Sequence, residues 1–173
     1  MGLTQRELCP DLTPWFALAV KHQHERRTQD ALALKSVPTL LPVYKTRIRW
    51  SDRVKETEVP LFAGYVFCRF TRAQRTSILT TPGVRSIVGF GGVPAPVETA
   101  EIEAIQAMLG SNLPLSPWPY LRPGDRVRVE RGPLRGLEGT LLREKDAFRL
   151  VIGIELLHRS IAAELDAEMI SPC

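Results

Sequence analysis

Large apolar side chains alternate along one stretch near the middle of the chain, residues 60–70. From Gly64 onward the pattern predicts a β-strand, because aromatic and β-branched residues are concentrated there. Successive strand residues point to opposite faces, Val66, Cys68 and Phe70 to one and Tyr65, Phe67 and Arg69 to the other. One face can pack under helices. The other is either covered as well or left as an exposed aromatic patch, a kind of surface that marks partner sites.

The segments before this strand predict three more strands and a helix. Residues 15–20 alternate as a strand in which Ala17 and Ala19 share a face and leave room beside it, residues 24–36 predict a helix, and residues 40–50 predict a second strand. After a turn at residues 51–53, residues 54–59 return as an antiparallel arm. The resulting hairpin is basic on one face. Its alternative interpretation is a solvated edge ribbon, in which Lys and Arg discourage further strand pairing.

Helix signals follow the central strand. Thr71 and Gln74 have the spacing of a capping box, and the helix they begin should end before Pro82. Residues 83–90 predict a strand and residues 91–96 a tight loop. Thr99 predicts the cap of another helix, which Gly110 can close. The apolar stripe of that helix comprises Ile102, Ile105, Met108 and Leu109.

Closely spaced prolines then divide the chain. Residues 111–123 hold four prolines, which form neither a helix nor a central strand and therefore predict a semi-rigid linker. Short strands are predicted over residues 126–131, 137–143, 147–157 and 159–164, with a last one near Met169, a pattern typical of a small barrel. We predict an α+β protein with a flexible tail (1–13), a first domain (14–110), a linker (111–122) and a second domain (123–173).

Composition narrows the class of protein. The chain has 173 residues, of which 44% are apolar, as in globular proteins. No apolar run approaches the roughly 20 residues of a membrane helix, and the N-terminus lacks the pattern of a secretion signal, so we expect a cytoplasmic protein. The net charge of +4 belongs to residues 1–112, which hold 14 basic and 10 acidic residues. Such an excess favours approach to polyanions but names no partner.

The chain offers no set of residues for catalysis. The three cysteines have no metal-type spacing and, being odd in number, argue against a disulfide framework. His22 and His24 have no third metal ligand near them in the sequence. No phosphate-binding loop and no nucleophile with its base is recognisable. We therefore predict a protein that is not an enzyme and that needs no cofactor or metal.

Several motifs in order resemble the NusG family of transcription elongation factors. In the first domain they are Trp15-Phe16, FAGYVF at residues 62–67, PGV at residues 82–84 and GFGGVPAP at residues 89–96. After the linker, PGDRVRV at residues 123–129, GPLRGLEG at residues 132–139 and AELD at residues 163–166 resemble the family's KOW module. The resemblance covers residues 14–171. It implies an N-terminal NGN α/β sandwich followed by a small SH3-like β-barrel, the KOW domain.

Within the family the chain resembles specialised paralogs of the UpxY and RfaH kind. The motifs are RIRW at residues 47–50, PLF at residues 60–62 and LLHRS at residues 156–160. Such paralogs prevent premature termination in long operons, often for surface polysaccharides. The resemblance implies a monomeric elongation regulator that binds RNA polymerase through its NGN domain and promotes read-through, or antitermination. The alternative is an RNA- or ribosome-binding protein that uses its KOW domain.

The resemblance also implies the positions of the contacts on the first domain. The polymerase-binding residues would be Phe62, Tyr65 and Phe67, beside Ala19. A second polymerase contact would use Arg75, Thr76 and Ser77, for which an ordinary helix surface is the alternative. A displaced DNA strand or upstream duplex would face six basic residues, Lys21, Arg26, Arg27, Lys45, Arg47 and Arg49. The alternative for this basic set is a solvated charged face.

The KOW partner surface implied by the resemblance comprises Leu134, Leu157, His158 and Arg159. Two of its features depart from the family pattern. Leu134 stands where the family usually has Phe, and Leu157-His158-Arg159 replaces a Phe-Gly-Arg turn. These departures leave open whether the domain contacts the Rho terminator or a ribosomal protein.

Overall fold

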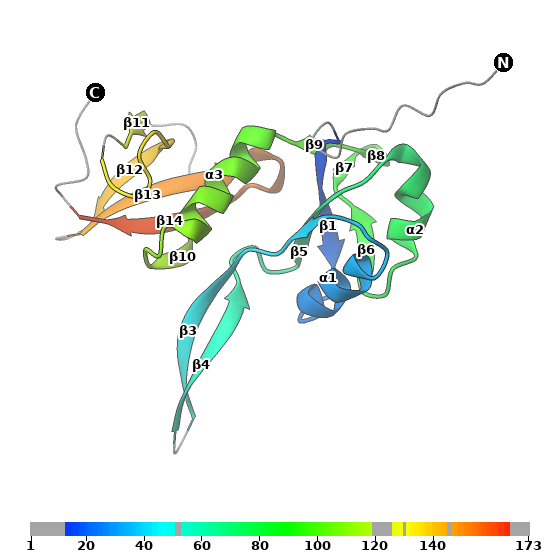
Figure 1. Cartoon of the computed structure of the whole chain (residues 1–173), viewed down its shortest axis with the longest axis horizontal. Coiled ribbons are helices and arrows are strands. Elements are labelled where there is room, and N and C mark those ends of the chain that lie inside the picture. Colours follow the sequence, from blue (N-terminus) through cyan, green and yellow to red (C-terminus); the bar gives the residue numbers. More distant parts are fainter. Residues whose placement is uncertain (1–12, 51–52, 119–125, 130, 145–146, 167–173) are drawn as a thin grey trace.

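The first domain is built on one antiparallel sheet. The structure, a computed structural model, describes residues 13–50, 53–118, 126–129, 131–144 and 147–166 (Figure 1). The strand order is β2-β5-β1-β6, and β9 also pairs with β1. These strands are β1 (Trp15–Val20), β2 (Thr39–Leu40), β5 (Tyr65–Arg69), β6 (Val84–Ile87) and β9 (Pro96–Val97). The sheet confirms the predicted strands at residues 15–20 and from Gly64 onward.

Helices cover both faces of this sheet. One face packs Leu18, Val66 and Cys68 in a buried cluster with Leu32 of α1 (Glu25–Ala33) and Ile78 of α2 (Arg75–Leu79). The other face packs against α3 (Thr99–Gly110). The predicted alternation of Val66 and Cys68 against Tyr65 and Phe67 is therefore confirmed.

The helix starts are partly as predicted. The short 3-10 turn η2 (Arg72–Gln74) precedes α2. Thr71 and Gln74 form the predicted capping box, in which the Gln74 side-chain oxygen accepts the Thr71 backbone N–H at 2.9 Å. The predicted cap of α3 is wrong by one residue, because Glu98 is the N-cap and Thr99 is the first helical residue.

Two hairpins extend from the first sheet. The strands β3 (Val43–Trp50) and β4 (Arg53–Pro60) pair along their whole length and project from the body of the molecule (Figure 1). The predicted strand over residues 40–50 is thus two strands, separated by Leu41 and Pro42, where proline supplies no ladder N–H. The predicted strand over residues 83–90 also divides, into β6 and β7 (Gly89–Phe90). The predicted loop contains β8 (Val93–Pro94), which pairs with β7, and the first residue of β9.

The second sheet has five antiparallel strands in the order β10-β14-β13-β12-β11. They are β10 (Leu115–Trp118), β11 (Arg126–Arg128), β12 (Glu138–Glu144), β13 (Ala147–Ile154) and β14 (Arg159–Leu165). The strand predicted over residues 147–157 ends at Ile154, and the 3-10 turn η3 (Glu155–Leu157) follows. The strand predicted near Met169 lies outside the described residues. Since β10 and β11 are the two edges of this sheet, the closed SH3-like barrel stays a prediction.

The proline-rich segment corrects one expectation. Residues 115–118 of the predicted linker form the strand β10, in which Pro117 lies opposite Ile161 of β14. Proline lacks an N–H and is tolerated in a strand only at a sheet edge or a bulge. The edge position of β10 satisfies this requirement. The boundaries given for the two domains otherwise stay predictions.

Helix α3 lies between the two sheets (Figure 1). One continuous buried cluster joins Phe67 of the first sheet, Ile105 and Met108 of α3, and Leu150 and Ile154 of the second sheet. At the start of α3 the Glu101 carboxylate accepts the backbone N–H of Glu155 at 3.0 Å. Burial raises the pKa of Glu101, while the hydrogen bond from Glu155 opposes this rise. The two sheets therefore share a core and a polar contact.

The raised pKa of Glu101 predicts a pH-dependent contribution to stability. A carboxyl whose pKa is raised on folding above its ordinary value of 4.5 contributes stability that is complete below that pH. This contribution is lost as the pH rises through the folded-state pKa. Glu101→Gln keeps an oxygen for the Glu155 N–H but cannot ionise. We expect the variant to melt progressively higher than the wild type as the pH rises above about 4.5.

Thermal unfolding of both proteins between about pH 4 and pH 7 measures this difference. The exposed Glu103→Gln on the same helix is the control, and it should show no such trend. A Glu101→Gln advantage that is largest at the acidic end of the range would contradict the assignment.

Candidate partner-binding surfaces

The residues predicted to bind polymerase gather on the α3 face of the first sheet. In the β1–β5 register Ala19 lies opposite Tyr65, and Ala17 lies opposite Phe67. An alanine side chain ends at Cβ and so fills little of the sheet face beside the ring across from it, although Ala17 and Phe67 are themselves both 0% exposed. Phe62 packs edge-on against Phe67, with ring centroids 5.5 Å apart. The structure thus brings the four predicted residues, Ala19, Phe62, Tyr65 and Phe67, together in one place.

The depth of these residues corrects the expectation of an open aromatic patch. Phe62 is 1% exposed and Phe67 is 0% exposed. Both belong to the cluster that contains Ile102 of α3. The helix and the second sheet therefore cover the apolar surface that was expected to be exposed. Tyr65 and Ala19 are half-buried and are the members of the predicted set that reach the surface. Their polymerase-binding role stays a prediction.

A buried carboxylate holds the turn that presents Tyr65. Gly64 adopts a φ of +84°, which favours glycine. Its N–H donates to Glu25 Oε1 at 2.8 Å, and its carbonyl accepts the Val20 N–H at 2.8 Å. Glu25 is only 4% exposed. Sequence reasoning missed this residue, although an acidic side chain in the first turn of a helix is a recognised stabilising signal.

The predicted second contact is an exposed surface at the start of α2. Arg75, Thr76 and Ser77 are all exposed. The Arg75 guanidinium donates to the Gly92 carbonyl at 2.8 Å and so joins α2 to the tip of the β7–β8 hairpin. The Ser77 carbonyl accepts a hydrogen bond from Lys35, which follows the end of α1, at 2.6 Å. These contacts fix the backbone of α2 between its neighbours and leave the Thr76 and Ser77 side chains at the surface.

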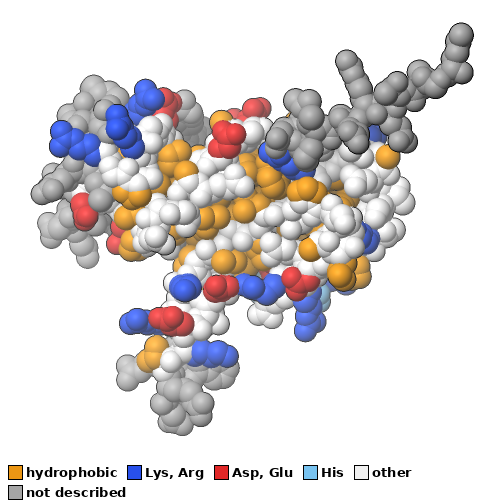
Figure 2. Space-filling view, in the orientation of Figure 1, with side chains coloured by type: hydrophobic (Ala, Val, Ile, Leu, Met, Phe, Trp, Pro, Cys, Tyr) orange, Lys and Arg blue, Asp and Glu red, His pale blue; other side chains and the backbone are white. Residues whose placement is uncertain are grey.

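The predicted basic set is divided by ion pairs. Arg26 pairs with Glu58, and Arg47 lies 3.5 Å from Glu56. The hairpin register places Lys45 opposite Glu58 and Arg47 opposite Glu56. Figure 2 shows acidic and basic side chains interspersed along the hairpin.

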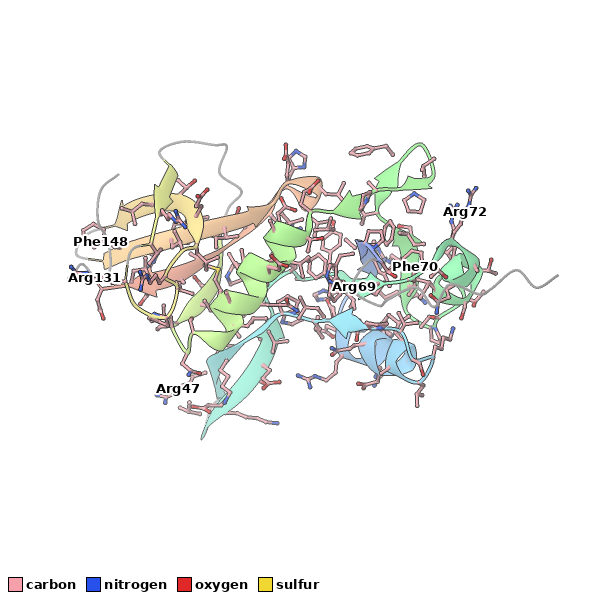
Figure 3. All side chains as sticks on the ribbon, turned by 45° about the horizontal axis from the view of Figure 1, so that its top comes forward. Arg47, Arg69, Phe70, Arg72, Arg131 and Phe148 are labelled. Carbon is pink, nitrogen blue, oxygen red and sulfur yellow. The ribbon has the colours of Figure 1, made fainter. Side chains whose placement is uncertain are left out.

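The face expected to be basic therefore has mixed charge. The β3–β4 register brings the acids of β4 opposite the bases of β3. Lys21 and Arg27 are exposed, and the Arg49 side chain is not among those described. Arg47 on the hairpin lies well apart from Arg72 at the start of η2, a basic residue outside the predicted set (Figure 3). The predicted set itself is interrupted by Glu56 and Glu58 of β4.

The predicted KOW partner surface is divided between core and exterior. Leu134 is 1% exposed and Leu157 is 8% exposed, so both are core residues, contrary to the surface role expected of them. Their apolar side chains belong to the cluster shared with α3. His158 and Arg159 are exposed. His158 has a left-handed φ of 50°, a conformation that glycine adopts without steric cost.

Other reactive groups offer little chemistry. Burial raises the pKa of the Cys68 thiol to about 12, so this cysteine is an inert core residue. The His24 ring lies 3.0 Å from the His22 carbonyl oxygen. Within the described residues no cluster of three or more potential metal ligands occurs. Among those same residues, none of the helices has the length and apolar character needed to cross a membrane.

Comparison with known proteins identifies the family. The pattern of the family described as "Transcription termination factor nusG" matches residues 13–106, more than half of the chain. This chain belongs to the NusG family. NusG of Lactococcus lactis subsp. lactis, a transcription termination/antitermination protein, is 25% identical over an alignment of 170 residues, gaps included, that covers 90% of this chain and 91% of that protein.

A second NusG protein and a solved NusG structure agree with this assignment. NusG of Thermus thermophilus is 25% identical over 149 residues, which cover 80% of this chain and 79% of that protein. The structure described as "Domain interaction in Thermotoga maritima NusG" has a TM-score of 0.59 at 18% identity and covers 95% of this chain and 99% of that chain. At this identity the structural match speaks for the fold alone. The NusG-like fold predicted from the motifs is confirmed.

The Glu25 contact yields a stability prediction. Glu25→Ala leaves the Gly64 N–H without its acceptor, and an unsatisfied buried donor costs about 1–3 kcal/mol. Glu25→Gln keeps a side-chain oxygen at the same distance and should cost less. Urea unfolding gives the free energy of unfolding of each variant. Equal losses for Ala and Gln would show that the hydrogen bond to Gly64 is not what stabilises the turn.

Proposed function

We propose that this protein regulates transcription elongation by binding RNA polymerase through its first domain. Membership of the NusG family supports a role in transcription termination or antitermination. The main observation that supports this binding site is the pairing of Tyr65 on β5 with Ala19 on β1. An aromatic ring beside a small residue offers a shallow apolar seat of the kind that receives an amphipathic helix. The proposal is a binding role without catalysis.

The finer proposal is that the protein acts as a specialised paralog of the UpxY and RfaH kind. It then promotes processive read-through, in a long operon such as one for surface polysaccharide synthesis, and works in the cytoplasm as a monomer. The exposed His158 supports this direction of effect. Its imidazole fills the left-handed turn position where the family pattern has glycine, so a partner that approaches the backbone closely meets added bulk.

The first test separates binding from folding on the α3 face. Tyr65→Ala should weaken binding to core RNA polymerase by about tenfold or more, as expected for an aromatic anchor. Phe67→Ala should instead destabilise the fold by about 3–5 kcal/mol, because its ring is fully buried. Binding kinetics on immobilised polymerase and urea unfolding measure the two effects.

Leu34→Ala is the matched control, since Leu34 is an apolar side chain that is 89% exposed at the end of α1. It should change neither property. Wild-type affinity in Tyr65→Ala would remove Tyr65 from the proposed site. Binding of the full chain to ribosomes or RNA, with none to polymerase, would favour the alternative of an RNA- or ribosome-binding KOW protein.

The second test concerns the direction of the effect. Transcription in vitro on a template with Rho-dependent stops should yield more full-length transcript when the protein is added. His158→Gly removes the side chain from the turn and should reduce this gain, because a close partner approach becomes possible. Earlier or stronger termination with the wild-type protein would refute read-through while leaving polymerase binding intact.

A further inference from the structure

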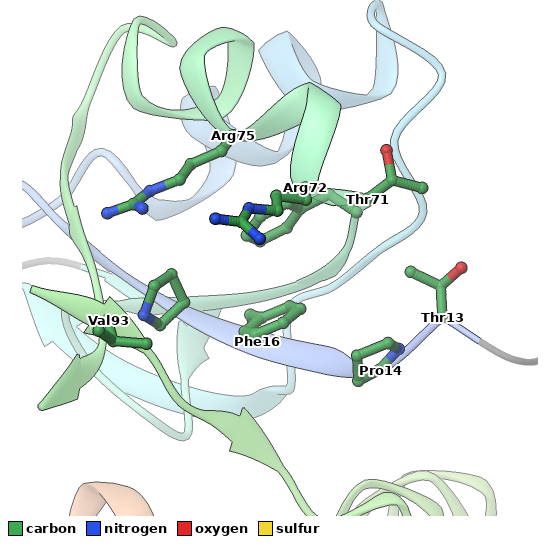
Figure 4. A pocket seen from close by; sticks show the side chains of 9 residues that line it. Thr13, Pro14, Phe16, Thr71, Arg72, Arg75 and Val93 are labelled. Atoms are coloured by element: carbon green, nitrogen blue, oxygen red, sulfur yellow. The ribbon is translucent and has the colours of Figure 1, made fainter.

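A cleft of about 560 Å³ opens on the face of the first sheet opposite α3 (Figure 4). Its apolar lining consists of Pro14, Phe16, Phe70, Val93 and Pro94. The rings of Phe16 and Phe70 are in contact, with centroids 4.6 Å apart. Phe70 is 5% exposed and lies deep, whereas Val93 is 68% exposed and stands at the rim. The cleft thus has a fixed aromatic floor and an accessible apolar edge.

Two arginines border this cleft. The side chains of Arg72 and Arg75 extend from η2 and α2 along one side, opposite Phe16 and Val93 (Figure 4). Among the described residues, no Asp or Glu lines the cleft and neither arginine forms an ion pair. One guanidinium N–H of Arg75 donates to the Gly92 carbonyl. A guanidinium has five N–H donors, so the others can bind a ligand. A ligand that carries negative charge would complement this rim.

The lining favours a peptide over a nucleotide. A nucleobase has a polar edge, and a polar group buried without a hydrogen-bond partner is unfavourable. The backbone N–H of Thr71, at the wall of the cleft, is already bound to Gln74, and the Thr71 hydroxyl lies 3.3 Å from the same Gln74 oxygen. An aliphatic or aromatic side chain needs no such partner.

We propose that this cleft binds a short segment of a partner protein in which an apolar side chain is flanked by Asp or Glu. The apolar side chain packs against Phe16 and Phe70. The neighbouring carboxylates accept hydrogen bonds from Arg72 and Arg75, in the forked geometry that arginine offers to carboxylates. The inference goes beyond polymerase binding at Tyr65, because it concerns the opposite face of the sheet and holds whether or not that proposal is correct. One cleft residue, Arg75, also belongs to the predicted second polymerase contact, so the cleft borders that contact and adds Phe16, Phe70, Arg72 and Val93 to it.

The test is a selection of random short peptides displayed on phage against the immobilised full chain. We expect enrichment of peptides with an apolar residue beside Asp or Glu. Synthetic fluorescein-labelled copies should bind the wild type and lose about tenfold or more in affinity to Arg72→Glu with Arg75→Glu, because hydrogen bonds between charged partners are roughly twice as strong as neutral ones. Val93→Ser should weaken binding by trimming the exposed apolar rim.

Arg85→Glu is the matched control, since Arg85 is an exposed arginine on β6 that does not line the cleft. It should bind the selected peptides like the wild type. Because Arg72, Arg75 and Val93 are exposed, their variants should fold, and melting curves check this. Enrichment of neutral or basic peptides, no enrichment, or equal affinity for the double variant would overturn the proposal. Arginine-dependent binding of a single-stranded oligonucleotide in place of acidic peptides would also overturn it.

Discussion

Burial of helix α3 from two sides determines which surfaces this protein can offer. Ile102, Ile105 and Met108 are completely inaccessible. Full burial of such side chains stabilises a fold by about 1.5–3 kcal/mol each. The cluster that buries them contains side chains of both sheets and extends from Phe67 to Ile154. A partner that buried Phe62 or Phe67 in its own interface would first have to open this cluster.

Most strands and helices of the first domain could be predicted from the sequence. Which apolar surfaces are buried between α3 and the two sheets could not. Strict alternation identified both faces of β1 and β5, and the apolar stripe of α3 was visible. A stripe does not say how many neighbours cover it, so the second contact of α3 was not predictable. Phe67 illustrates the limit, because an aromatic residue on a strand has the same pattern whether a helix covers it or a partner does.

Predictions from local sequence were wrong where a segment pairs with a strand that is distant in the sequence. Prolines at positions 114 and 117 excluded a helix and a central strand, but they did not exclude the edge strand that β14 makes possible. Charges on the hairpin were counted on one arm, while Glu56 and Glu58 on the other arm neutralise them across the register. The role of Glu25 was not predictable for the same reason, because its hydrogen-bond partner Gly64 lies 39 positions away in the sequence.

The two candidate surfaces lie back to back on a single strand. Phe16 of β1 points into the cleft, whereas its neighbour Ala17 and, two positions further, Ala19 point toward α3. Because strand residues alternate between faces, ligands at the two surfaces do not compete for the same side chains. Any coupling between them must pass through movement of β1 or β5, which are held by main-chain pairing along five residue pairs. Such a rigid connection favours independent binding, so the protein could hold two partner segments at once on opposite sides of one thin sheet.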